Sequence, residues 1–131
     1  MVDGSFDPLH DGHVRYFEFA ASLGLPVFCN IASDGWTSTK HRVFLDREKR
    51  AIVLDSIRFI DFVHCTATTT ADVLRIVQPR NYVKGADWKA RGGVPPEEAA
   101  ICRELGIEIV YANTEMNSST QILKRFTERH E

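Results

Sequence analysis

Short apolar runs alternate with amphipathic segments along this chain. The runs are rich in strand-forming residues and predict buried strands over 26–32, 59–63, 81–85 and 107–112. The intervening and final segments space their apolar residues as helices do, which predicts helices over 14–24, 46–57, 70–77, 95–106 and 118–130. Strands that alternate with helices favour parallel pairing and right-handed crossovers. The pattern therefore predicts an α/β fold, a Rossmann-like doubly wound parallel five-stranded sheet.

The first strand of such a sheet is short in this sequence. The first loop begins at Asp3, which leaves Met1 and Val2 for a strand that usually has about five or six residues. We expect either a stunted, truncated first strand or a chain recorded without its natural start, and we favour the second. No linker or repeat interrupts residues 1–131, which predicts a single domain.

Composition narrows the classes of protein that need to be considered. The 131 residues are 44% hydrophobic, and 16 basic residues against 18 acidic ones give a formal net charge of -2. This balance gives no support for nucleic acid or membrane as a partner. The 3 cysteines form no CxxC pair, and neither a signal peptide nor a long apolar run is visible, so we expect a cytoplasmic protein.

The segment GSFDPLHDGH, residues 4–13, joins the first strand to the first helix. Gly4 lets the backbone turn sharply and approach a ligand, and Gly12 keeps the junction with the helix open. A helix N-terminus carries unpaired N–H groups and partial positive charge, both of which attract phosphate. His10 and His13 lie three residues apart on one helix face, so both can contact one polyphosphate, and we expect both to become cationic near neutral pH.

Two histidines three residues apart also occur as an incidental surface pair or as part of a metal site. A zinc site needs a third and usually a fourth ligand, and the spacing of His41, His64 and His130 provides none. We therefore predict no metal site built from histidines. The glycines and the helix N-terminus around the pair favour phosphate.

A second helix N-terminus shows the same chemistry near the end of the chain. Ser118 and Gln121 have the S-x-x-Q spacing of a capping box. Ser118, Ser119 and Thr120 place hydroxyls and backbone N–H groups at one point, as a phosphate cradle would. An ordinary helix cap is the alternative, and the first loop makes the cradle the better interpretation.

These motifs resemble the signatures of a known family. GSFDPLHDGH is similar to the GxFDxxHxGH signature of the cytidylyltransferase-like nucleotidyltransferases, and further similarities extend the resemblance to about residue 126. They lie in YVKGADW (82–88), in NTEMNSSTQILKRF (113–126) and in the helix that carries Glu48 and Arg50. The resemblance implies a nucleotide site formed by Gly4, Ser5, Phe6, Asp7, Gly12, Lys84, Gly85, Asp87, Thr114, Ser118, Ser119 and Thr120.

The resemblance also assigns expected roles in catalysis and substrate binding. His10, His13 and Lys40 would stabilise the transition state, while Arg42, Arg50 and Trp88 would bind substrate. Each of the last four residues has a simpler alternative: a solvated basic loop for Lys40 and Arg42, a salt bridge for Arg50, and packing for Trp88. The family reaction is attack of an acceptor phosphate on the α-phosphorus of an NTP, with Mg²⁺ held mostly by the substrate.

The motifs leave open which phosphate is the acceptor and which base the nucleotide carries. KGADW resembles the adenylyltransferase group that makes ADP-heptose from heptose 1-phosphate, so we favour ATP and a sugar phosphate. Trp88 and the TE at 114–115 resemble a CTP-dependent glycerol-3-phosphate cytidylyltransferase, although Asn113 replaces the arginine of that motif. A non-catalytic nucleotide-binding module is a further alternative, whereas a flavodoxin-like signalling or electron-transfer domain would need a flavin-binding loop or a phosphoacceptor aspartate cluster, and neither is evident. Relatives in the family imply a possible homodimer and a possible fusion to a kinase domain.

Overall fold

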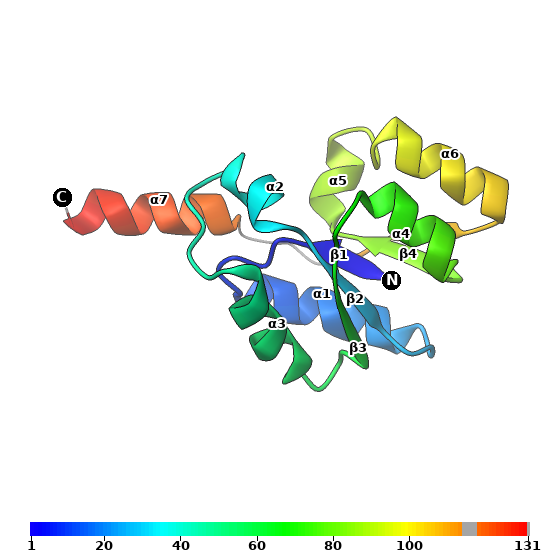
Figure 1. Ribbon diagram of the computed structural model, residues 1–131, viewed down its shortest axis with the longest axis horizontal. Coiled ribbons are helices and arrows are strands. Elements are labelled where there is room, and N and C mark those ends of the chain that lie inside the picture. Colours follow the sequence, from blue (N-terminus) through cyan, green and yellow to red (C-terminus); the bar gives the residue numbers. More distant parts are fainter. Residues whose placement is uncertain (114–117, 131) are drawn as a thin grey trace.

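The computed structural model describes residues 1–113 and 118–130 (Figure 1). The strands are β1 (Val2–Gly4), β2 (Phe28–Ile31), β3 (Phe62–Cys65), β4 (Asn81–Lys84) and β5 (Glu108–Tyr111). The helices are α1 (Asp11–Ser22), α2 (Asp34–Ser38), α3 (Arg47–Asp55), α4 (Thr70–Val77), α5 (Ala86–Ala90), α6 (Pro96–Leu105) and α7 (Ser119–His130).

The strands form a three-stranded sheet in the order β3-β2-β1 and a two-stranded sheet of β4 and β5. Parallel pairing joins β1 to β2 and β2 to β3, and a second parallel pair joins β4 to β5. The two groups meet where the backbone N–H of Val83 donates to the carbonyl of Met1 at 2.9 Å. The chain therefore winds outward from β1 in both directions, which confirms the predicted doubly wound parallel sheet.

Side chains of the central strands alternate between two hydrophobic cores. Cys29 of β2 and Val83 of β4 pack in the core that also contains Phe17 of α1 and Leu54 of α3. Tyr82, the neighbour of Val83, packs in the other core, to which α4 and α6 contribute the apolar residues Val73, Leu74 and Cys102. Helices on both faces bury both sides of the sheet, as parallel sheets require.

Most predicted elements are present, and the third strand is the clearest error. It begins at Phe62 instead of Phe59, because Ile60 is buried in the core and the Asp61 carboxylate accepts the Val27 N–H at 2.7 Å. Within the described residues β3 pairs with β2 alone, and its Phe62 and His64 are exposed, so its apolar signal is weak. The five-residue helices α2 and α5 were not predicted because they are too short to show a helical period.

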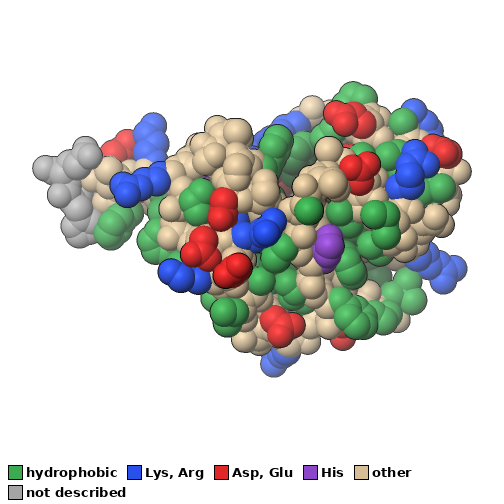
Figure 2. All heavy atoms as spheres, viewed as in Figure 1, with side chains coloured by type: hydrophobic (Ala, Val, Ile, Leu, Met, Phe, Trp, Pro, Cys, Tyr) green, Lys and Arg blue, Asp and Glu red, His purple; other side chains and the backbone are tan. Residues whose placement is uncertain are grey.

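The last helix contacts the rest of the protein near its N-terminus and extends away from it (Figure 1). Figures 1 and 2 show α7 extending from the body, with the C-terminus at its far end. Figure 2 also shows acidic and basic side chains intermixed over the visible face. No helix in the described parts of the chain is long and apolar enough to cross a membrane.

Candidate active site

A cleft of about 560 Å³ opens at the carboxyl ends of β1 and β4, beside the N-termini of α1 and α7. It contains most of the residues predicted for nucleotide binding. Its lining consists of Asp3, Gly4, Ser5, Phe6, Asp7, His13, Tyr16, Lys40, His41, Lys84, Gly85, Asp87, Trp88, Arg91, Ser118, Ser119, Thr120 and Gln121. Ligands of doubly wound sheets bind at this end of the strands, next to the point where the strand order reverses.

His10 and His13 form a fixed pair at the N-terminus of α1. The Nδ1 atom of His10 accepts the Gly12 N–H at 3.1 Å, and the Nδ1 atom of His13 accepts the His10 N–H at 3.3 Å. The two rings stack with their centroids 3.8 Å apart, and His13 lines the cleft. A neutral imidazole that accepts at Nδ1 carries its proton at Nε2, so these bonds select the Nε2–H tautomer of both rings.

The environment of His13 also keeps its ring uncharged. Burial, assisted by the neighbouring His10, lowers the pKa of His13 to about 3. Near neutral pH the ring is therefore a neutral N–H donor, and the expectation of a cationic ring is wrong for His13. The prediction that this histidine faces a phosphate site is compatible with that state, since a neutral donor at a helix N-terminus still stabilises an anion.

The N-terminus of α7 meets the first loop at the cleft. Ser119 Oγ donates to the carbonyl of Pro8 at 2.8 Å, and the Gln121 N–H donates to Ser118 Oγ at 3.4 Å. The second bond is the N-cap half of the predicted S-x-x-Q box. Two helix N-termini thus converge on one cleft. Thr114, which was predicted to bind nucleotide, lies outside the described residues.

Three cations line the same cleft. Lys84 is buried, and its ammonium lies 2.7 Å from the Asp3 carboxylate and 4.6 Å from the Trp88 ring centroid. Burial lowers the pKa of Lys40, and the positive charges of Lys84 and Arg91 lower it further. Lys40, Lys84 and Arg91 are thus close enough to act together on an anion.

The first loop is held in shape by packing and by backbone hydrogen bonds. Phe6 has a left-handed φ of 52°, and its ring packs edge-on to His13 with centroids 5.1 Å apart. A Cβ on Gly4 would lie 3.1 Å from that ring, so Gly4 is needed for close packing, and the sharp turn predicted there was wrong. The buried Asp7 carboxylate accepts the N–H groups of Phe44 and Leu45 at 2.7 and 2.8 Å, so it anchors the loop.

Arg50 does not fit the predicted role of a substrate ligand. Its side chain is fully buried. Its guanidinium donates to the carbonyls of Leu45, Ser5 and Ala32 and to the Asp34 carboxylate at 2.5 Å. The guanidinium is therefore enclosed by protein groups and cannot contact a ligand. Its role is to support the loop that carries Ser5.

Arg42 also lies outside the cleft that contains the histidine. It is exposed and lines a separate hollow between residues 41–44 and α7, together with Leu123 and Lys124. Lys40, two residues earlier, does line the main cleft. The basic loop was therefore correctly expected near the site, but it turns away from the cleft after His41.

Sequence reasoning missed two charged residues of the cleft. Asp3 accepts hydrogen bonds from Lys84 and Thr70, and the Tyr82 hydroxyl lies 3.1 Å from its carboxylate. Its position at the end of the first strand, next to the end of the strand that carries Lys84, was a usable signal. Arg91 follows a short helix in a glycine-rich loop, where no periodic pattern marks it.

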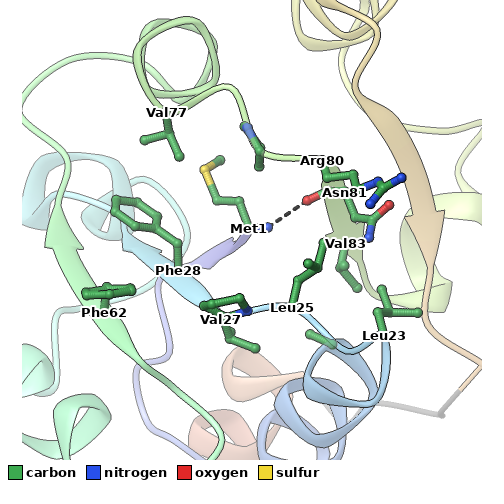
Figure 3. Close-up of a pocket in the computed structure, with 13 residues that line it drawn as sticks. Met1, Leu23, Leu25, Val27, Phe28, Phe62, Val77, Arg80, Asn81 and Val83 are labelled. Atoms are coloured by element: carbon green, nitrogen blue, oxygen red, sulfur yellow. Dashed lines mark hydrogen bonds between the residues drawn. The ribbon is translucent and has the colours of Figure 1, made fainter.

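A second hollow lies at the opposite, amino-terminal ends of the strands (Figure 3). It is mainly apolar, and Met1, Val27, Phe28, Phe62 and Val83 are among its lining residues. The amino group of Met1 donates to the Asn81 carbonyl across it at 2.6 Å. None of its described lining residues is a histidine, in contrast to the cleft at the other end of the sheet.

The carboxylates of the cleft suit a cation that arrives with its substrate. The described residues contain no cluster of three or more histidine, cysteine or acidic side chains that could hold a metal. Asp3 and Asp7 already accept hydrogen bonds, whereas Asp87 is exposed. Magnesium in such sites is bound by one or two carboxylates and by substrate phosphates, and Asp87 could supply one ligand.

Comparison with known proteins places these features in a family. A family model described as Cytidylyltransferase-like matches residues 1–125. The chain belongs to this family. Cytidylyltransferase-like proteins of this type are nucleotidyltransferases, which confirms the resemblance of GSFDPLHDGH and the expectation of an enzyme.

Individual relatives of this cytidylyltransferase-like chain agree in fold and sequence. The bifunctional protein HldE of Escherichia coli is 34% identical over 135 residues, which covers 95% of this chain and 27% of that protein. The HldE protein of Citrobacter koseri is also 34% identical, over 133 residues. A lipopolysaccharide core biosynthesis protein from Thermoplasma volcanium has the same fold, with a TM-score of 0.74, 22% identity and coverage of 88% of this chain and 96% of that chain.

Proposed function

We propose that this chain transfers an NMP group from an NTP, with ATP favoured, to a sugar phosphate such as heptose 1-phosphate and releases pyrophosphate. One observation carries the proposal: the N-termini of α1 and α7 meet at a cleft lined by His13, Ser119 and the cations Lys40, Lys84 and Arg91. Such an arrangement suits a bound polyphosphate, because helix N-termini and cations both stabilise anions.

The proposed reaction needs no covalent intermediate on the protein. An oxygen of the acceptor phosphate forms a bond to the α-phosphorus, and the bond from that phosphorus to the bridging oxygen breaks. The electron pair leaves with pyrophosphate. The acceptor phosphate is already an anion, so the residues position the reactants and stabilise charge without a strong general base.

Each part of the cleft then has a defined task. The Nε2–H of His13 donates to a phosphate oxygen, while the backbone N–H groups at the start of α7 bind another. Lys40, in the loop after α2, adds positive charge to the cleft. Magnesium, when bound, neutralises the triphosphate, and Asp87 is the exposed carboxylate of the cleft that can contact it.

Two observations support the choice of substrates. The KGADW segment resembles the heptose-directed adenylyltransferases, and relatives named HldE are 34% identical to this chain. Those relatives are called bifunctional, and the chain spans 27% of the Escherichia coli protein, so we assign it one of their activities. We also propose that this transferase lies in the cytoplasm, a reducing compartment in which free cysteines are usual. Trp88 lines the cleft and favours the second candidate, CTP with glycerol 3-phosphate or a similar polyol phosphate, because a tryptophan at this position resembles the glycerol-3-phosphate cytidylyltransferases.

The test is pyrophosphate release in the presence of Mg²⁺. ATP and CTP are each assayed with heptose 1-phosphate, other sugar 1-phosphates and glycerol 3-phosphate. The variant His13→Asn keeps an acceptor for the His10 N–H and removes the Nε2 donor. His64→Asn is the matched control, because His64 is exposed on β3 and does not line the cleft.

Release with ATP and a sugar 1-phosphate that is lost in His13→Asn and kept in His64→Asn supports the proposal. Release with CTP and glycerol 3-phosphate would replace it with the second candidate. Nucleotide binding by calorimetry without pyrophosphate release across the whole panel would show a binding module.

A further inference from the structure

Arg91 lines the cleft, and its contacts contribute little to the stability of the fold. It ends the short helix α5, lines the cleft and has a side chain that is 66% exposed. Its guanidinium forms an ion pair with the carboxylate of Asp87, four residues earlier, at 3.8 Å. Exposed ion pairs of this kind contribute little to stability, so the fold gives no reason for a cation here.

The loop that follows fixes the position of Arg91. Gly92 and Gly93 have left-handed φ values of 100° and 107°. The Gly93 N–H donates to the Trp88 carbonyl at 2.8 Å, and the Val94 N–H donates to the Tyr111 hydroxyl at 3.3 Å. The loop is thus folded back onto α5 and β5, and it holds the Arg91 backbone at the cleft.

Arg91 acts together with two other groups of the cleft. Its guanidinium lies 5.3 Å from the Trp88 ring centroid. Its positive charge also lowers the pKa of Lys40, which lies in the loop after α2. Arg91 and Lys40 therefore approach the cleft from opposite sides of β1. A guanidinium beside an indole face can bind a phosphate through paired N–H groups while the indole packs on a sugar ring.

The proposed reaction needs two anion sites in one cleft. The N-termini of α1 and α7, with His13 and Ser119, already suit the triphosphate. Lys84 is buried and paired with Asp3 at 2.7 Å, whereas Arg91 is exposed and its ion pair with Asp87 spans 3.8 Å, so Arg91 can exchange that contact for a ligand. We propose that Arg91 binds the phosphate of the acceptor, with Trp88 against its sugar, an inference that rests on the proposed transferase function.

The test compares Arg91→Gln with Lys89→Gln. Lys89 lies in α5, two residues before Arg91, and is an exposed cation that does not line the cleft, so each variant loses one positive charge from the same segment. KM for the acceptor, KM for the NTP and kcat are measured with the substrate pair that the wild type uses. Nucleotide affinity is measured separately by calorimetry, and Arg91→Lys tests whether charge alone suffices.

We expect Arg91→Gln to raise the acceptor KM by about ten- to a hundredfold, the loss typical of a charge-assisted bidentate contact. The NTP KM and the nucleotide affinity should stay within about twofold of wild type, Arg91→Lys should recover part of the loss, and Lys89→Gln should match wild type. A rise in the NTP KM instead of the acceptor KM, or equal behaviour of Arg91→Gln and Lys89→Gln, overturns the inference. A wild type that turns over no pair fails the proposed function itself, which separates the two failures.

Discussion

The imidazole of His13 stacks on that of His10, and the backbone N–H of His10 donates to the Nδ1 of His13. The pair is therefore held as neutral Nε2–H donors by the backbone around it. This arrangement links a local cap of α1 to the chemistry of the cleft.

We expect His13→Asn to lower the transfer rate by about a hundredfold, the usual loss when one donor to a developing charge is removed. The asparagine oxygen can still accept the His10 N–H, so the start of α1 should keep its structure. Steady-state kinetics gives the rate, and circular dichroism checks the helix content. An unchanged rate would exclude His13 from the reaction.

The lowered pKa of His13 also predicts how stability changes with pH. The ring titrates near 6.5 in the unfolded chain and at about 3 in the folded protein. Between these values the unfolded state binds the extra proton, so acidification destabilises the fold. This residue should reduce the free energy of unfolding by on the order of 1–2 kcal/mol between pH 7 and pH 5.

Urea unfolding of the wild type, His13→Asn and His64→Asn at the two pH values isolates that contribution. Only His13→Asn should lose part of the pH dependence. If all three proteins lost stability equally on acidification, the ring would have no pKa shift of this kind.

Replacement of Arg50 should affect stability first. Arg50→Met leaves Asp34 without its cation and three carbonyl groups without their donors. Removal of one partner of a buried charge pair costs about 3–5 kcal/mol, and the half-exposed Asp34 places the expected loss at the lower end. Urea unfolding measures the loss, with Lys49→Met as the exposed neighbour for comparison. Wild-type stability in Arg50→Met would contradict the assigned role.

Ser119→Ala should weaken nucleotide binding without unfolding the protein. The change removes the hydrogen bond from Ser119 to the Pro8 carbonyl, which joins α7 to the first loop. The loss of one such bond corresponds to a roughly fivefold lower affinity. Calorimetry with the nucleotide tests this, and Thr127→Ala, which removes a hydroxyl farther along α7, serves as the control. Equal affinities of the two variants would show that the contact has no role in binding.

Alanine substitutions at Gly92 and Gly93, the two residues after Arg91, separate the cost of backbone strain from the cost of a steric contact. Both have left-handed φ values, so alanine strains each of them. A Cβ at Gly92 meets nothing within 4 Å, whereas one at Gly93 lies 3.1 Å from the Tyr111 hydroxyl. Gly93→Ala should therefore be destabilised by about 1 kcal/mol more than Gly92→Ala, because its contact adds to the strain. Thermal unfolding measures the stability of both variants. A smaller loss of stability for Gly93→Ala than for Gly92→Ala would contradict the loop geometry.

The sequence was sufficient to predict the architecture, because period and apolar clustering are local properties. Buried runs such as 81–85 and capped helices such as 95–106 appear in the structure within a residue or two of their expected bounds. The edge strand β3 was misplaced, since its exposed Phe62 and His64 show no buried run.

The candidate site could be predicted only in part, because contacts across the fold have no local signature. The motif located His13 and Ser119 correctly at the cleft, yet it could not show that Arg50 is enclosed by the carbonyls of Leu45, Ser5 and Ala32. Asp3 and Lys84 are 81 residues apart in the chain, and only the sheet order brings them together.

The pairing of cations with carboxylates in the cleft has a consequence for selectivity. Asp3 lies against Lys84, and Asp87 lies near Arg91, so much of the positive charge is balanced before any ligand arrives. A long polyanion such as RNA, which binds through extended surface potential, would gain little from this cleft. A compact triphosphate, the ligand proposed above, can approach the donors within hydrogen-bond distance, so we expect the cleft to select ligands by direct contact and not by long-range attraction.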